Sequence, residues 1–150
     1  MSLPGSPYLA RSPGSDAADT EVELRLDGCS LDALARRFGT PLFVYSQRAV
    51  CDAASAYLEA LAGRPHLLCY AMKANSNLAL LQTLVRAGCG FDIVSGGELE
   101  RALAVGADAS RIVFSGVGKT RAEMTRALHA GVRCFNVESE AELDVLSEQA

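Results

Sequence analysis

The sequence lacks any long apolar run and any concentration of basic residues. Its longest apolar stretches, at 41–45 and 67–72, are far shorter than the roughly 20 residues that span a bilayer, so no transmembrane helix is expected. Fourteen Lys and Arg stand against 18 Asp and Glu, a formal net charge of −4, and the basic residues do not gather in one stretch. Neither nucleic acid nor a membrane is therefore expected as a partner.

The sequence also lacks the patterns of a secreted or metal-binding protein. Its five cysteines are an odd number without a C-x-x-C pair, and the first residues contain no apolar segment of a secretory signal. Reduced thiols and a cytoplasmic location are the simplest interpretation. Only two histidines occur, His66 and His129, and neither has Cys, Asp or Glu at ligand spacing. No metal site is expected.

Composition divides the chain into three parts. Nine of the first twenty residues are Pro, Gly or Ser, which predicts a disordered leader over 1–20. Residues 21–45 form an opening strand-and-helix segment, with an alternating strand at 22–26 and an amphipathic helix at 30–38. The rest of the chain, 46–150, is predicted to be one α/β domain. The run PLFVYS at 41–46, at the junction, predicts a further strand, followed by an alanine-rich helix at 49–61.

A βα unit recurs from residue 67 onward, with starts near 67, 90, 111 and 133. The strands are continuous apolar runs, which is typical of parallel strands buried on both faces. Three capping boxes begin the helices after the last three strands, and a glycine closes the helix before each of these strands. The boxes are Ser95 with Glu98, Thr120 with Glu123 and Ser139 with Glu142, and the glycines are Gly88, Gly106 and Gly131.

This spacing favours a (β/α)8 barrel over an open doubly wound sheet. A dinucleotide-binding sheet requires G-x-G-x-x-G after its first strand, where this sequence has KANSN. A barrel needs eight units, but only four follow residue 67, with one more strand and helix at 42–62. The chain also stops inside a predicted helix. We therefore expect the first part of a larger protein, a truncated barrel with two open sheet edges.

Two lysines and one aspartate are the chemical candidates. Lys119 lies in GVGKT, which fails the P-loop pattern because Val113 stands where glycine is required; a plain strand-to-helix turn or a backbone anion site remains. Lys73 ends the strand 67–72, on the catalytic face of a barrel, where apolar surroundings would favour a nucleophilic amine. A surface lysine is the alternative. Asp92 lies inside the strand 90–94 and must be paired, either with local backbone N–H groups or at the end of the barrel near Lys73.

Five segments, in order, carry a resemblance to a known family. They are RFGTPLFVYS at 37–46, YAMKANSN at 70–77, GFDIVSGGELE at 90–100, IVFSGVGKT at 112–120 and CFNVESEAEL at 134–143. Together they resemble the fold-type III pyridoxal-phosphate-dependent decarboxylases, and especially their diaminopimelate branch. The resemblance implies an alanine racemase-like, TIM-type (β/α)8 barrel, present here in part, and a second β domain absent from this chain.

The resemblance also implies roles for named residues. Lys73 would form the internal aldimine with pyridoxal 5′-phosphate, and Ala71 would pack beside the cofactor. Asp92 would lie on the next barrel strand, close to Lys73 and the cofactor ring. Glu98 matches an acidic position of the family. Its alternative is a purely structural role as a capping acid. The implied reaction converts meso-2,6-diaminopimelate to L-lysine and CO2.

The implied enzyme is a homodimer, and its phosphate-binding, pyridine-nitrogen and substrate-binding residues lie outside these 150 residues. The chain by itself is therefore expected to be inactive. Two alternatives stay open: a non-catalytic pyridoxal-phosphate-binding or pseudoenzyme barrel fragment, and a relative of the ornithine or arginine decarboxylases.

Overall fold

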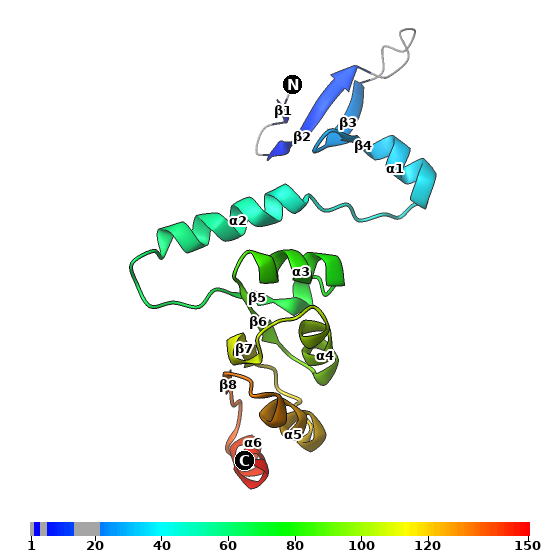
Figure 1. Ribbon diagram of the computed structural model, residues 1–150. Helices are drawn as coiled ribbons and strands as arrows, with labels where there is room; N and C mark the ends of the chain where they lie inside the picture. Colours follow the sequence, from blue (N-terminus) through cyan, green and yellow to red (C-terminus); the bar gives the residue numbers. More distant parts are fainter. Residues whose placement is uncertain (1, 4–5, 14–21) are drawn as a thin grey trace. The chain divides into compact units, whose positions relative to one another are not determined.

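The computed structural model describes residues 2–3, 6–13 and 22–150. Within the chain, two compact units separate at residue 52, Met1–Asp52 and Ala53–Ala150. Figure 1 shows the first unit in blue and cyan and the second from green to red. Each unit is described by itself. No helix among the described residues is long and apolar enough to cross a membrane.

An antiparallel sheet of four short strands, in the order β1-β2-β3-β4, forms the first unit. Its strands are β1 (Ser2–Leu3), β2 (Ser6–Pro13), β3 (Val22–Leu26) and β4 (Cys29–Ser30). Asp27 and Gly28, both with positive φ, make the two-residue turn between β3 and β4. The hydroxyl of Ser30 then caps helix α1 (Leu31–Phe38), which ends at Gly39 with φ of 83°. The predicted strand at 22–26 and helix at 30–38 are confirmed.

The predicted leader differs from the structure over residues 6–13, which form β2 rather than a disordered segment. This strand pairs antiparallel with β3, from Leu9 opposite Leu26 to Pro13 opposite Val22. Local composition rich in Pro and Ser disfavours order, but it contains no information about a pairing partner that comes later in the chain. Residues 14–20 of the predicted leader lie outside the described residues.

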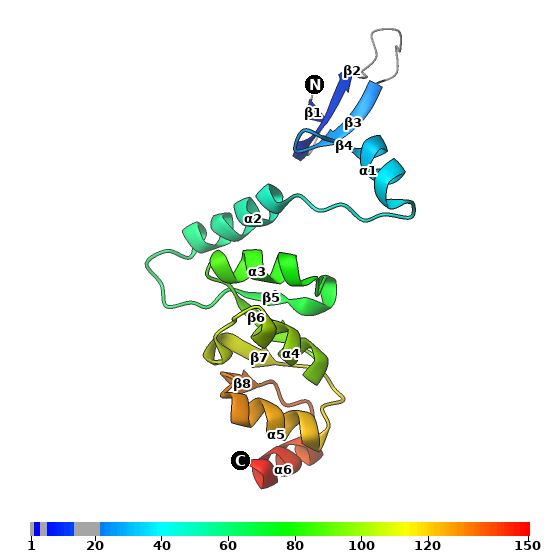
Figure 2. The same ribbon diagram turned by 45° about the vertical axis from the view of Figure 1, so that its right-hand side comes forward.

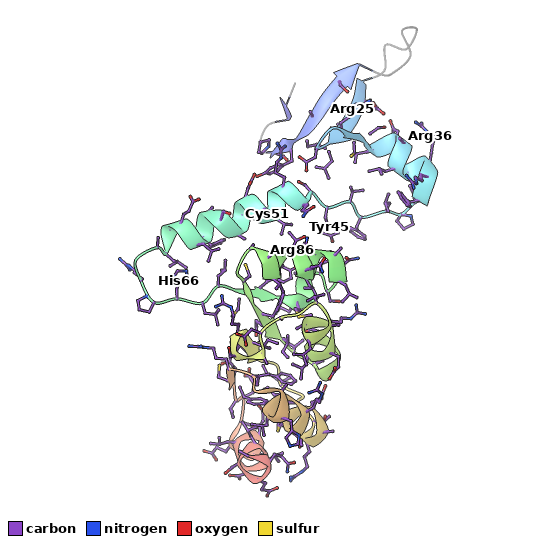
Figure 3. All side chains as sticks on the ribbon, viewed as in Figure 1. Arg25, Arg36, Tyr45, Cys51, His66 and Arg86 are labelled. Carbon is purple, nitrogen blue, oxygen red and sulfur yellow. The ribbon has the colours of Figure 1, made fainter. Side chains whose placement is uncertain are left out.

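The segment 41–46 was predicted to be a strand, and that prediction is wrong. The chain runs there without strand pairing to any described residue, and its apolar side chains are exposed, with Phe43 at 85%. A β-rich run becomes a strand only where a neighbour supplies backbone hydrogen bonds. Figure 3 labels Tyr45, likewise exposed, on this segment just before helix α2 (Gln47–Ala60).

Contacts from the antiparallel sheet hold the first turns of α2. The phenol of Tyr8 on β2 donates a hydrogen bond of 2.9 Å to Oδ2 of Asp52. Arg48 pairs with Asp27 at 2.7 Å, and its guanidinium lies 5.0 Å from the centroid of the Tyr8 ring. The predicted helix at 49–61 is thus confirmed, beginning two residues earlier and ending one residue earlier.

Four parallel strands in sequential order, β5-β6-β7-β8, form the sheet of the second unit. The strands are β5 (Cys69–Ala71), β6 (Gly90–Ile93), β7 (Ile112–Phe114) and β8 (Cys134–Phe135). The helices are α3 (Leu78–Arg86), α4 (Gly96–Ala104), α5 (Arg121–Ala130) and α6 (Glu140–Gln149), with short 3₁₀ turns at η1 (Met72–Ala74) and η2 (Ala109–Arg111). Figures 1 and 2 show strand and helix alternating down this unit, which confirms the predicted βα repeat.

The core of this unit lies on one face of the parallel sheet. Phe91, Ile93, Ile112 and Phe114 point to that face and are fully buried, together with Leu81, Leu99 and Met124 from helices α3, α4 and α5. The alternate positions on the other face are only half-buried at Ala71, Asp92 and Val113, and exposed at Cys134. The prediction of strands buried on both faces therefore holds for one face only, because no described element covers the second.

The observed helix caps agree in part with the caps predicted from the sequence. Ser95, Thr120 and Ser139 each accept a hydrogen bond from the backbone N–H three residues later, and Gly88, Gly106 and Gly131 have the positive φ expected after a helix. Only the Thr120 cap is a reciprocal capping box, because the carboxylates of Glu98 and Glu142 bind elsewhere. A predicted capping acid can thus accept its hydrogen bond from a different backbone N–H or from a lysine.

Candidate active site

The carboxyl ends of the four parallel strands lie in one row at one end of the sheet, and this row is the carboxyl edge of the second unit. A polar side chain occurs at this edge on every strand: Lys73 just after β5, Asp92 in β6, Ser115 just after β7 and Asn136 just after β8. In βα barrels this edge carries the catalytic groups. The strand order therefore brings together two predicted site residues and two that were not predicted.

Asparagine side chains fix the loop that follows Lys73. The amide oxygen of Asn77 accepts from the N–H of Ala79 and caps α3, while the amide oxygen of Asn75 accepts from the N–H of Asn77, both at 2.9 Å. The phenol of Tyr70 on β5 donates to the carbonyl of Asn75 at 3.3 Å. Lys73 thus stands in the short turn η1 between a strand and a capped loop, a defined position on the backbone.

The amine of Lys73 is exposed, and none of the described residues forms a hydrogen bond or an ion pair with it. The apolar surroundings expected from its place at the end of an apolar strand are absent among the described residues. The open face of the sheet explains this difference. An unpaired primary amine at a strand end remains available to an electrophile such as an aldehyde.

Ala71 and Asp92 lie directly beside each other on neighbouring strands. They are Cα partners in the parallel register of β5 and β6, so both side chains point to the half-buried face. Strand β6 also contacts η1, the turn that carries Lys73. The three residues predicted to hold the cofactor therefore lie in one small region of the strand edge.

A side-chain hydrogen-bond chain runs from Asp92 across the next two strands. The hydroxyl of Ser115 donates to Oδ1 of Asp92 at 2.5 Å, and the amide of Asn136 donates through Nδ2 to the Ser115 oxygen at 2.9 Å. Of the two predicted ways to satisfy Asp92, the local backbone N–H groups are not used. The carboxylate is bound from a neighbouring strand end.

Glu98 has a structural partner in this arrangement. Its Oε2 accepts a hydrogen bond of 2.7 Å from the N–H of Val94, at the junction between β6 and α4. Its own N–H donates to the Ser95 hydroxyl at 3.2 Å. These bonds account for Glu98 as a residue that fixes the start of α4, in line with the structural interpretation of this acid.

The GVGKT segment is a strand-to-helix turn, with its lysine directed into the protein. The side chain of Lys119 is completely buried, and its ammonium group donates to the carbonyls of Gly116 and Asn136 at 2.6 and 2.8 Å. Its third donor meets Oε1 of Glu142 at 2.6 Å. All three donors are used, so Lys119 has none left for an anion.

Sequence reasoning missed Ser115, Asn136 and the ion pair of Lys119 with Glu142. A signal for the first two existed, since each follows its strand at the place where Lys73 follows β5. The partner of Lys119 had no comparable signal because Glu142 lies 23 residues later, where it resembles an ordinary capping acid.

A row of parallel βα units with polar side chains gathered at the carboxyl ends of the strands defines a class of protein, the βα-barrel proteins whose sites lie at this end. The comparisons identify the family. The profile of the pyridoxal-dependent decarboxylases, for their pyridoxal-binding domain, matches residues 47–150. The chain belongs to this family, and residues 47–150 are the part of it that matches the pyridoxal-binding domain.

Individual relatives narrow the resemblance to one branch. The chain is 57% identical over 130 residues to the diaminopimelate decarboxylase of Pseudomonas aeruginosa, an alignment that covers 87% of this chain and 31% of the relative. Crystal structures of diaminopimelate decarboxylase from M. jannaschii superpose with TM-scores of 0.84 and, in the complex with L-lysine, 0.80. Their identities are 35% and 38%; they match 95% and 85% of this chain, but 32% and 31% of their own. The chain thus spans about a third of the length of these relatives.

Proposed function

We propose that these 150 residues are the N-terminal part of an enzyme that decarboxylates meso-2,6-diaminopimelate to L-lysine and CO2. The observation that carries the proposal is the unpaired amine of Lys73 at the strand edge that also carries Asp92. The 57% identity to a diaminopimelate decarboxylase supports this substrate over ornithine or arginine.

The residues at the edge fit pyridoxal 5′-phosphate. The cofactor is an aldehyde, and Lys73 offers an exposed primary amine without a competing partner among the described residues. Ala71, the register partner of Asp92, has only a methyl side chain, which leaves room for a flat ring beside the strand. We assign Lys73 as the catalytic residue that binds the cofactor, and Ala71 and Asp92 as residues that contact it.

When bound, pyridoxal phosphate accepts the electron pair left behind when CO2 departs. The chain's own residues hold and orient the reacting groups. The Lys73 nitrogen supplies the covalent attachment at a fixed point on η1. The carboxylate of Asp92, held by the Ser115 hydroxyl, places a polar group at the same carboxyl end of the strands.

The aligned length supports the proposal that other parts of the enzyme supply some groups of the site. Because the chain spans about 31% of the Pseudomonas relative, we propose that phosphate-binding, pyridine-nitrogen and substrate-binding groups come from outside residues 1–150 and that the working enzyme is a homodimer. On this proposal the isolated chain has no decarboxylase activity. Five free cysteines are compatible with work in the reducing cytoplasm.

The test is an assay of the complete enzyme with meso-diaminopimelate, which should release L-lysine and CO2 in equal amounts. Lys73→Arg should abolish this activity while retaining the positive charge. Turnover of ornithine or arginine in place of meso-diaminopimelate would reject the substrate assignment. Retention of pyridoxal phosphate without any decarboxylation would favour the non-catalytic barrel.

A further inference from the structure

We propose that Ser115 and Asn136 are positioning residues for Asp92, and that the buried Lys119–Glu142 pair anchors them. The inference rests on the proposed function, in which Asp92 faces the pyridoxal cofactor next to Lys73. It adds a role for two residues that do not themselves need to contact the cofactor.

The register of the sheet places these side chains on one line. Val113 is the Cα partner of Asp92 on one side and of Cys134 on the other. Ser115 and Asn136 each come two residues after these positions, so they continue the same face toward the carboxyl edge. Backbone bonds extend the ladder to both: the N–H of Ser115 donates to Ile93 at 2.7 Å, and that of Asn136 donates to Phe114 at 2.9 Å.

The directions of the hydrogen bonds from Asn136 to Ser115 to Asp92 suit a carboxylate as the last acceptor. Asn136 donates its amide N–H to Ser115, and Ser115 then donates its single proton to Oδ1 of Asp92. A carboxylate accepts only, so both polar links are satisfied without competition. The other oxygen, Oδ2, has no partner among the described residues and is therefore available to a further donor.

Asn136 is the end of the hydrogen-bond chain farthest from Asp92, and it is fixed because Lys119 holds its backbone. Its ammonium group joins the carbonyl of Asn136 to that of Gly116 in the preceding loop, and Glu142 on α6 compensates its charge. With the Lys119 side chain fully buried and all three donors used, the two loops cannot separate without exposing a broken ion pair. Asp92 is thus oriented from a fixed support two strands away.

The experiment measures cofactor attachment in the complete enzyme. Pyridoxal phosphate is titrated into each variant, the adduct is reduced with borohydride, and labelling of Lys73 is quantified by peptide mass spectrometry. The absorbance maximum of the bound cofactor is recorded before reduction. We expect Ser115→Ala to raise the half-saturating concentration about tenfold, the effect of losing a hydrogen bond to a charged group, and to move the maximum. Ser115→Thr, which keeps the hydroxyl, should stay within about twofold of the wild type.

A matched control and a second variant separate positioning from folding. Ser110 donates to Asp108 at 2.7 Å in the exposed turn η2, so Ser110→Ala removes the same kind of bond and should change neither readout. Asn136→Asp keeps the shape but replaces the donor with an acceptor, and it should weaken attachment about as much as Ser115→Ala. Urea unfolding of every variant shows that it is folded.

The outcomes are distinct. Wild-type labelling and an unmoved absorbance maximum in both Ser115→Ala and Asn136→Asp would overturn the positioning role and leave the proposed function intact. Wild-type enzyme that retains no cofactor on Lys73 would overturn the proposed function and this inference with it. Equal losses in Ser110→Ala and Ser115→Ala would also reject positioning, since the effect would not depend on Asp92.

Discussion

Nζ of Lys119 lies 2.6 Å from Oε1 of Glu142, and the two side chains are only 0% and 9% exposed. Removing one member of a buried ion pair leaves the other charge without compensation, at a cost of about 3–5 kcal/mol. We therefore expect Lys119→Met to lower the free energy of unfolding by about that amount. Urea unfolding followed by circular dichroism measures the change.

The pair of Arg121 with Glu148 is the matched control, because it joins the same two helical regions at 2.5 Å with side chains 56% and 61% exposed. Arg121→Met should cost no more than about 1 kcal/mol, the usual range for a solvated ion pair. Similar losses in both variants would contradict a special role for the buried pair.

Gly90 is required by close packing at the start of β6. A Cβ at this position would lie 2.2 Å from the carbonyl oxygen of Arg111 and 3.2 Å from Sγ of Cys69. The first contact is with the backbone of Arg111, the last residue of η2 before β7, and a backbone carbonyl cannot rotate away as a side chain can. Gly90→Ala should therefore destabilise the second unit by about 1–3 kcal/mol or more, as for overpacked cores, measured by urea unfolding.

Gly97 provides the comparison, since its added Cβ would meet only the Ser95 hydroxyl at 3.9 Å. It lies in helix α4, where alanine is favoured over glycine by roughly 0.5–1 kcal/mol. Gly97→Ala should consequently stabilise the protein. If Gly90→Ala were equally harmless, the close approach of β6 to Arg111 would be wrong.

Glu123 links the starts of two neighbouring helices and predicts a dependence of stability on pH. Its carboxylate accepts from the N–H of Gly96 at 2.7 Å and from the N–H of Thr120 at 2.9 Å. These bonds, that of Gly96 first, hold the pKa of Glu123 below its ordinary value of 4.5. A lowered pKa in the folded state contributes stability above the unfolded pKa, and this contribution is lost as pH falls through the folded value.

The expected result is that Glu123→Gln is less stable than the wild type at pH 7 and that this difference shrinks as the pH falls below about 4.5. Unfolding midpoints in urea at a series of pH values measure it. Glu140→Gln, in the exposed first turn of α6, removes one charge without such bonds and controls for net charge. A difference that grew toward acid would have the wrong sign for this linkage.

The cysteines should differ in their rates of alkylation. Burial raises the pKa of the Cys69 and Cys89 thiols, and Cys89 is almost inaccessible, whereas Cys29 and Cys134 are exposed. Because the thiolate is the reactive form, iodoacetamide at pH 8 should modify Cys29 and Cys134 first and Cys89 last. Peptide mass spectrometry over time gives the order, and rapid labelling of Cys89 in folded protein would contradict the buried core around it.

Local signals were sufficient to predict much of the fold from the sequence. Gly88 and Thr120 mark a helix end and a helix start through their own backbone preferences, and the apolar runs around Phe91 and Phe114 mark buried strands. Errors arose where a distant partner decides. Residues 6–13 become a strand because β3 pairs with them, and residues 41–46 do not because no described strand does.

The candidate site shows the same contrast between residues marked by local signals and residues that depend on distant partners. Lys73 and Asp92 stand out because a charged group at or inside an apolar strand requires an explanation. Ser115 and Asn136 are ordinary polar residues until the parallel register places them on the face of Asp92. Their bonds to each other depend on side-chain placement across 21–23 residues, which periodicity does not encode.

The two lysines of the chain give the sharpest test of cofactor attachment. Lys119 is buried with three partners, whereas Lys73 is exposed, and none of the described residues pairs with it. After incubation with pyridoxal phosphate and reduction with borohydride, the 150-residue chain should carry the adduct on Lys73 in preference to Lys119. Asp92→Asn, at the residue proposed to contact the cofactor, should reduce labelling of Lys73, and Asp108→Asn, at the residue that caps η2, should leave it unchanged. Equal labelling of both lysines would mean that exposure and the neighbouring carboxylate do not direct the reaction, and that these residues alone do not assemble the site.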